Sequence, residues 1–253
     1  MSGFGNSMLL AGLAMALLSL SAYVSYSRGG KEQRGVARGS FVVSALAVLA
    51  ASVALMYAFL AGRYDIQYVA GYSSSDLPLI YRISAFWAGQ EGSFLLWALM
   101  GAAIGLALMR QAGSWEGPLM ALFNATQAFL LLLMVIRSPF APGDPGAVEG
   151  HGLNPLLQDP WMAIHPPLIF LGYAALAVPF VFAIAALLRR DYDGWVARAL
   201  PWTLFAWVGL GAGIFVGGYW AYRVLGWGGY WGWDPEEKAS HIPWLLATAL
   251  LHG

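Results

Sequence analysis

Six long apolar runs constrain the fold of this 253-residue chain more than any other feature of its sequence. A helix needs about 20 mostly apolar residues to cross the ~30 Å hydrocarbon core of a bilayer. The runs predict membrane spans at 8–27, 40–61, 94–110, 118–136, 165–188 and 200–222, with a seventh from about 243 to 253. Only 10% of the residues are charged, against about a quarter in soluble proteins. We therefore predict an all-α, polytopic transmembrane helix bundle that forms a single membrane domain over 1–253.

The distribution of Lys and Arg predicts how the bundle is oriented. The loops after the first, third and fifth spans carry eight of these residues, and the loops after the other three carry five. Positive charge favours the cytoplasmic side, so the N-terminus and the loop after the sixth span are expected outside. The N-terminal segment MSGFGNS has no basic residue, and a cleavable signal peptide is not expected.

Net charge and cysteine content narrow the possible partners. The formal net charge is zero, which gives no electrostatic reason to expect a nucleic-acid partner. The chain contains no cysteine, so it offers neither a thiol nucleophile nor a thiolate ligand. Any chemistry on thiols must therefore use the thiols of a partner.

The stretch after the sixth span combines tryptophan, tyrosine and glycine, and reads GGYWAYRVLGWGGYWGWDPEEKASHIP over 217–243. Glycine and proline cost about 1 and 3 kcal/mol inside a helix, so we predict an extracytoplasmic aromatic-rich loop at 223–242. Aromatic rings interleaved with glycines give flat apolar faces that a ligand can approach closely. We expect a platform for a large planar molecule. The alternative is an aromatic belt at headgroup level, which needs no glycines between its tryptophans.

Several motifs resemble one family of membrane proteins. LGWGGYWGWDPEEKAS resembles the tryptophan-rich WWD signature of the haem-handling proteins of cytochrome c maturation. WAGQEGS, GLNPLLQDPWMAIHPPLIFLGY and PWLLATALLHG are similar to segments of its CcmF-type haem lyase subunits. The chain departs from the usual pattern at Val224, Glu236 and Lys238, which puts in doubt details at the rim of the motif.

The resemblance implies a function for the tryptophan-rich loop. Haem would lie on the loop while the thiols of an apocytochrome c CxxCH motif add to its vinyl groups. The residues implied in this catalytic site are Trp227, Trp231, Trp233 and Asp234, and those implied in holding haem also include Gly228, Gly229 and Tyr230. Expected partners are the haem chaperone CcmE, thioreduction and apocytochrome-presenting subunits of the CcmH, CcmI and CcmG type, and apocytochrome c. The expected location is the bacterial inner membrane, with this loop on the periplasmic side.

Two of the four histidines are expected to bind haem iron. His165 precedes Pro166 and Pro167, so we predict that the fifth span starts at one of these prolines, with the imidazole beside its entrance. If the seventh helix starts at Pro243, His252 lies about 14 Å deep at 1.5 Å per residue, where ionisable residues are rare and functional. The resemblance implies that His165 is a periplasmic ligand and His252 an axial ligand of a transmembrane haem b.

The other polar candidates are expected to have structural roles. His151 lies between glycines in a flexible turn, and His241 stands where the family usually has an aromatic residue. Glu91 is expected in the first turn of a helix, near the positive end of its dipole. Asn124 and Gln127 share one face of the fourth span, where we expect interhelical hydrogen bonds.

Each iron-binding histidine lacks a partner in this sequence. Haem iron commonly takes two axial ligands, and a surface histidine and a mid-membrane histidine cannot share one iron. A helix ending inside the bilayer would also leave carbonyl groups unsatisfied. We therefore expect the chain to be the N-terminal portion of a longer or split protein.

Two rival functions remain open from the sequence. A haem-transfer module of the CcmC or CcsA kind, without lyase activity, could use His165 and His241 as its two histidines. A transporter or structural helix bundle would explain the apolar runs alone, although a transporter is expected to show a repeat or a broken polar helix.

Overall fold

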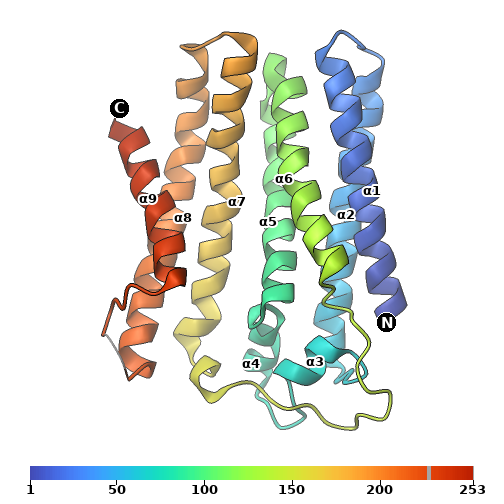
Figure 1. Ribbon diagram of the computed structural model, residues 1–253, viewed down its shortest axis with the longest axis vertical. Helices are drawn as coiled ribbons and strands as arrows, with labels where there is room; N and C mark the ends of the chain where they lie inside the picture. Colours follow the sequence, from blue (N-terminus) through green and yellow to red (C-terminus); the bar gives the residue numbers. More distant parts are fainter. Residues whose placement is uncertain (227–228, 253) are drawn as a thin grey trace.

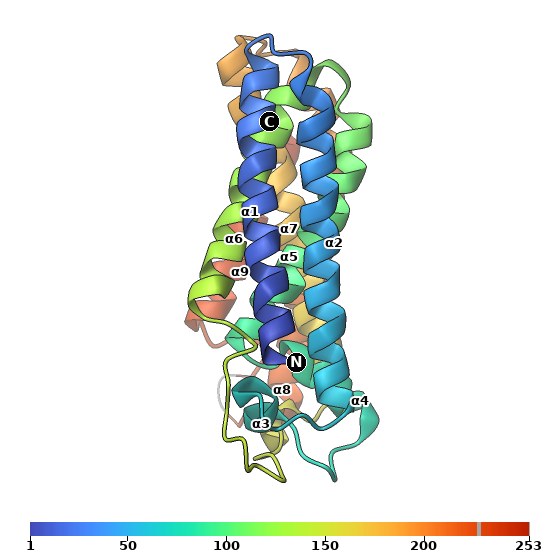
Figure 2. The ribbon, with the colours of Figure 1, turned by 90° about the vertical axis from the view of Figure 1, so that its right-hand side faces the viewer.

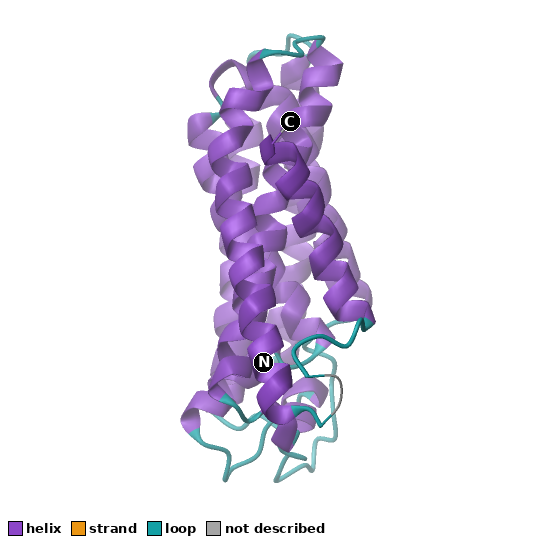
Figure 3. Cartoon of the chain, turned by 90° about the vertical axis from the view of Figure 1, so that its left-hand side faces the viewer, coloured by secondary structure: helices purple, strands orange, loops and turns teal. Residues whose placement is uncertain are grey.

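The computed structural model describes residues 1–226 and 229–252, and these fold almost entirely into helices (Figure 1). The long helices are α1 (Ser2–Ser27), α2 (Gln33–Leu60), α5 (Gln90–Gln111), α6 (Glu116–Ile136), α7 (Pro160–Arg189), α8 (Gly194–Val224) and α9 (Pro235–His252). The short ones are α3 (Gln67–Tyr72), α4 (Leu79–Ser84), η1 (Ala85–Trp87), η2 (Gly113–Trp115) and η3 (Pro155–Leu157). The described residues contain no strand (Figure 3).

The long helices alternate in direction, which confirms the predicted all-α membrane bundle. Six of them are long and apolar enough to cross a bilayer. Figures 1 and 2 show that the N-terminus, α3, α4 and the loops after α2, α6 and α8 gather at one end. We call this the loop end. α9 carries Glu236, Glu237 and Lys238 near its start and is outside the six, so its insertion as a seventh span stays a prediction.

Two helix starts differ from the sequence expectations. α7 begins at Pro160 and α9 at Pro235, several residues before the prolines at which we expected them to start. Both follow an aspartate, and a proline at the first helical position loses no intrahelical hydrogen bond. Pro166, Pro167 and Pro243 therefore lie inside helices. The predicted loop at 223–242 is correspondingly shorter, because α8 runs to Val224 and α9 already includes 235–242.

Close approach of α7 and α8 depends on small residues. A Cβ atom built on Gly172 would lie 2.7 Å from the Leu210 backbone nitrogen. One built on Gly213 would lie 2.8 Å from the Ile169 side chain. Small residues at contacts between membrane helices let the backbones approach and gain dispersion energy. Gly209, Gly213 and Gly217 repeat at four-residue spacing, which is typical of close contacts between membrane helices.

A buried charge cluster ties three helices together at the end opposite the loops. Glu116, at the start of α6, is 1% exposed, and its carboxylate accepts hydrogen bonds from Arg34 and Arg38 of α2 and from Tyr23 of α1. The Arg34–Glu116 pair is 2.8 Å apart. Arg34 and Arg38, two of the basic residues from which the orientation was predicted, therefore also hold helices of the bundle together.

The predicted interhelical hydrogen bond of Asn124 is wrong. Its side-chain amide donates to the Met120 carbonyl of its own helix at 2.7 Å, and not to another helix. A short polar side chain in a helix can reach the carbonyl four residues earlier. Gln127 does face α5, because a Cβ on Gly101 would collide with its amide group.

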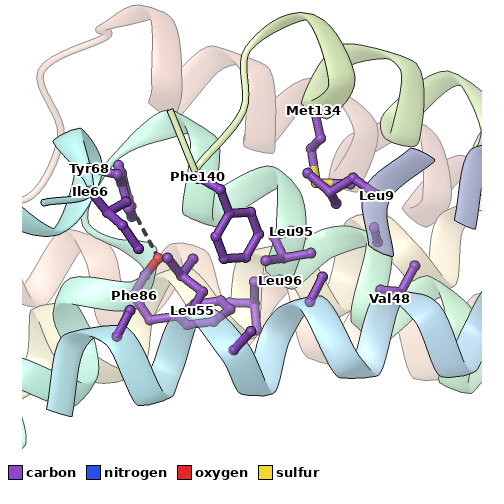
Figure 4. Packing of buried hydrophobic residues seen from close by; sticks show 14 of the residues in the cluster. Leu9, Val48, Leu55, Ile66, Tyr68, Phe86, Leu95, Leu96, Met134 and Phe140 are labelled. Carbon is purple, nitrogen blue, oxygen red and sulfur yellow. Dashed lines mark hydrogen bonds between the residues drawn. The ribbon is translucent and has the colours of Figure 1, made fainter. Parts of the chain in front are cut away.

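The short helices at the loop end are anchored to the bundle core. Ile66, Phe86 and Phe140 pack together over Leu55 and Leu95, as Figure 4 shows. The Tyr68 hydroxyl donates to the Phe86 carbonyl at 3.1 Å, drawn as a dashed line in Figure 4, and accepts from the Gly89 N–H at 2.9 Å. These contacts fix the segment that enters α5. Glu91 lies in the first turn of α5, as expected.

Acidification is expected to release one contact between two loops at the loop end. Glu149 accepts hydrogen bonds from the Ser75 hydroxyl and from the N–H groups of Gly150 and Ser75, which lower its pKa to about 2. Because the fold lowers this pKa, the ionised carboxylate stabilises the contact at pH values above the ordinary carboxyl pKa. This stabilisation is lost as the pH falls toward about 2. Protection of the Ser75 amide from hydrogen exchange, relative to its intrinsic rate, should persist at neutral pH and disappear in that acidic range.

The matched variants for this contact are Glu149→Gln and Asp144→Asn. Glu149→Gln should remove the Ser75 protection at neutral pH. The Asp144 carboxylate accepts from the Gly146 N–H within its own loop, and its replacement should leave Ser75 protected. Equal protection in all three proteins would contradict the assignment.

Candidate haem site at the loop end

A cavity of about 610 Å³ opens at the loop end between the start of α5, the α7–α8 pair and the start of α9. Its size lies within the ~300–1,000 Å³ typical of small-molecule and cofactor sites. The described residues that line it include His165, Trp220, Trp231 and Asp234. The structure thus brings predicted residues from α7 and from the tryptophan-rich loop to one cavity.

His165 is oriented by a backbone contact. Its Nδ1 lies 2.8 Å from the Gly213 carbonyl oxygen, which can only accept, so Nδ1 carries the proton. The neutral ring then keeps its lone pair on Nε2. Such a backbone contact to one ring nitrogen commonly fixes a metal-binding histidine. His165 sits in the second turn of α7 and not at its entrance, because α7 starts at Pro160.

Neighbouring residues on α8 hold this imidazole in place. The Trp220 ring lies nearly parallel to it, with centroids 6.5 Å apart and an interplanar angle of 15°. The Trp220 indole donates to the Leu156 carbonyl at 3.2 Å. Gly217 lies directly against the ring, since a Cβ built there would be 2.5 Å from Nδ1. The position of His165 therefore requires glycine at 217.

The described tryptophans of the loop do not form one flat platform. Trp231 and Trp233 are perpendicular, at 90° with centroids 5.7 Å apart. Trp231 lines the cavity, whereas Trp233 is 61% exposed and has a φ of 57°, a strained conformation for a bulky residue. Gly229 also lines the cavity, and Tyr230 stacks on Tyr222 at 4.2 Å. The predicted residues Trp227 and Gly228 lie outside the described part of the chain.

Asp234 has a clear structural contact. Its carboxylate accepts from the Glu237 N–H at 2.8 Å, while the Glu237 carboxylate accepts from the N–H groups of Asp234 and Gly232. This reciprocal pattern is a capping box, and it starts α9 directly at the loop. The DPEE sequence predicts this capping box, because it places an aspartate at the N-cap, a proline at the first helical position and a glutamate at the third.

His241, which we expected to be structural, lies in an aromatic cluster. Its ring centroid is 5.2 Å from Trp231, 6.3 Å from Trp233 and 6.1 Å from Trp244. These four residues line a second, apolar cavity of about 510 Å³ against α8. Trp231 borders both cavities, but His165 lines only the first and His241 only the second.

Neither of the remaining histidines lines the candidate site. His252 is exposed near the end of α9, which runs away from the loop end (Figure 1). It is 11 residues beyond His241, or about 16 Å along the helix axis. His151 lies in a loop and donates its backbone N–H to the Ala70 carbonyl at 2.7 Å.

Comparisons with known proteins agree on one family. The model of the cytochrome c assembly protein family matches residues 87–253. The chain is 40% identical to the cytochrome c-type biogenesis protein CcmF of Escherichia coli, over 100% of this chain and 40% of that protein. It is 39% identical to the cytochrome c-type biogenesis protein ccl1 of Rhodobacter capsulatus, over 98% of this chain and 39% of that protein.

A solved structure also matches. The structure titled cytochrome c heme lyase CcmF is 36% identical, with a TM-score of 0.86, and the match covers 99% of this chain and 41% of that one. The chain thus spans about two-fifths of the length of the relatives that it matches. It belongs to the cytochrome c assembly protein family and is related to its CcmF-type members.

Proposed function

We propose that this chain is the part of a haem lyase subunit that holds haem as substrate during cytochrome c maturation. The observation that carries the proposal is the His165 imidazole, whose Nδ1–H is bound to Gly213 and whose Nε2 is left with a lone pair beside a ligand-sized cavity. A neutral imidazole with one nitrogen fixed is the usual axial ligand of haem iron.

The residues around the cavity would position haem for attack by partner thiols. Trp231 and Trp220 provide apolar surface, and the glycines of α8 and the loop let a planar ring come close. Holding two reactants in one orientation makes their encounter nearly unimolecular. The resemblance implies that further residues of the loop also contribute to this surface, namely Trp227, Gly228, Gly229, Tyr230 and Trp233. Asp234 would act by fixing the loop to α9.

The reaction itself would be addition of a thiol across a vinyl group. The S–H bond breaks, a C–S bond forms on one vinyl carbon, and the proton goes to the other carbon, with no net oxidation. Because the chain has no cysteine, both thiols would come from an apocytochrome c CxxCH motif. The haem chaperone CcmE would supply the haem, and subunits of the CcmH, CcmI and CcmG type would keep the thiols reduced and present them. The loop end would face the periplasmic side of the inner membrane.

His252 would hold the iron of a transmembrane haem b. The fit of the described residues to that group is partial, since α8, the neighbour of α9, has no histidine. The second ligand would come from outside this chain. Such a haem would supply electrons that keep the substrate iron reduced.

A haem-transfer module of the CcmC or CcsA kind remains the alternative. That reading needs His165 and His241 to serve one haem, but they line different cavities that share Trp231. The geometry therefore favours the lyase proposal.

Absorption spectra of the full-length protein test the proposal. In detergent, His165→Ala should lose the haem that is added to the loop-end cavity and keep a reduced b-type spectrum. His252→Ala should lose the b-type spectrum and still bind added haem. His151→Ala, which alters a loop histidine away from both sites, should match the wild type. Haem content that does not change in His165→Ala would contradict the role of His165.

A further inference from the structure

The charge of the loop-end cavity is one-sided. Asp234, Glu236 and Glu237 line it at the start of α9, and none of the described lining residues is Lys or Arg. Burial, followed by the nearby Asp234, raises the pKa of Glu236 above its usual range. The α9 side of the cavity is therefore unfavourable for a further anionic group.

The opposite side of the cavity has neutral hydrogen-bond donors. Trp87, Ala88, Gly89 and Gln90 form this wall, where η1 leads into α5. Figure 1 shows α5 and α9 on either side of α7. The Trp87 indole nitrogen is buried and has no hydrogen-bond partner among the described residues. A buried unpaired donor costs about 1–3 kcal/mol, and in a native structure it calls for an absent partner.

The wall is also held rigidly. The Tyr68 hydroxyl accepts from the Gly89 N–H and donates to the Phe86 carbonyl. The Ser93 hydroxyl donates to the Trp87 carbonyl at 2.9 Å. Glu91 lies next to this wall but does not line the cavity. Burial is the larger cause that raises the pKa of Tyr72, and the charge of Glu91 is the second. Trp87 and Gln90 thus line the cavity, whereas the Glu91 carboxylate does not.

We infer that the wall formed by 87–90 is the subsite for the two propionate carboxylates of haem, with the Trp87 indole and the Gln90 amide as donors. The inference rests on the proposed function, since it concerns how the same haem is oriented. Haem carries both propionates on one edge, and that edge avoids the three carboxylates of the α9 side. The α5 N-terminus adds a partial positive charge at this wall. The opposite edge of the ring then points toward the loop and α9.

The test compares two porphyrins that differ only in the charge of this edge. Iron protoporphyrin IX and its dimethyl ester are titrated into the full-length protein in detergent, and the affinities are read from the Soret band. Trp87→Phe keeps an apolar ring and removes the N–H, so the free acid should bind about tenfold more weakly, while the ester, whose carbonyl accepts only a weaker neutral hydrogen bond, should lose less. Gln90→Leu should act in the same direction.

The matched control is Trp161→Phe. Trp161 packs edge-on against Tyr219 at 4.9 Å in the first turn of α7 and does not line the cavity, so neither affinity should change. Equal losses for acid and ester in Trp87→Phe, or no loss for either, would overturn the propionate subsite while leaving His165-dependent binding intact. Binding of both porphyrins that is insensitive to His165→Ala would overturn the proposed function and this inference together.

Discussion

Gly217→Ala is expected to weaken haem binding by about 10- to 100-fold, the usual cost of disturbing the partner that orients a metal-binding histidine. The added Cβ would lie 2.5 Å from His165 Nδ1, and real contacts of this kind do not occur. The imidazole must turn away, which breaks its hydrogen bond to Gly213 and moves Nε2. A Soret titration of the full-length protein measures the loss.

The control for this variant lies on the same face of α8. A Cβ on Gly209 would meet its nearest neighbour, Gly172, at 3.6 Å, an ordinary contact. Gly209→Ala should therefore keep haem affinity and slightly favour the helix. If both variants bind haem like the wild type, the imidazole does not depend on the close approach of α8.

Removing both arginines of the buried charge cluster should have the largest effect on stability. Arg34→Ala with Arg38→Ala leaves the Glu116 carboxylate, which is 1% exposed, without a counter-charge, and breaking a buried pair in this way costs about 3–5 kcal/mol. Glu116→Ala should cost less, because the arginine side chains are 46% and 41% exposed and can turn to solvent. Unfolding of the full-length protein in mixed micelles with SDS gives the free energy of unfolding of each variant and thus tests this order.

The control pair is Arg28→Ala with Lys31→Ala, which removes the same charge from the same region. Both side chains are exposed, so the cost should stay within about 0.5 kcal/mol. Similar losses in the two double variants would mean that net charge at this end matters and the buried pairing does not.

The fold class followed from the sequence because each span satisfies its own backbone hydrogen bonds and must be apolar. Helix starts were less well predicted. Pro166 and Pro243 looked like helix entrances, but Asp159 and Asp234, each followed by proline, start the helices earlier. The Asp159 carboxylate accepts from the Trp161 N–H at 2.8 Å, so a capping aspartate decided the boundary.

The candidate site was predicted in part. His165, Trp231 and Asp234 were selected from the sequence, and the structure places them around one cavity. The wall at 87–90 belongs to the WAGQEGS motif of the resemblance but was not predicted to line the site, because residues more than 70 positions from His165 in the chain come together only when α5 packs against α7. The GxxxG-like spacing of Gly209, Gly213 and Gly217 could have revealed the close α7–α8 contact that orients His165.

The sequence by itself determined the membrane bundle, the shared end of the loops after α2, α6 and α8, and the aromatic-rich loop, since these depend on local apolarity, helix length and chain alternation. Only the tertiary structure decided which nitrogen of His165 is free, that His165 and His241 line different cavities, and that the described tryptophans are perpendicular. Those properties depend on contacts between helices that are distant in the chain, and a one-dimensional pattern of residues does not specify such contacts.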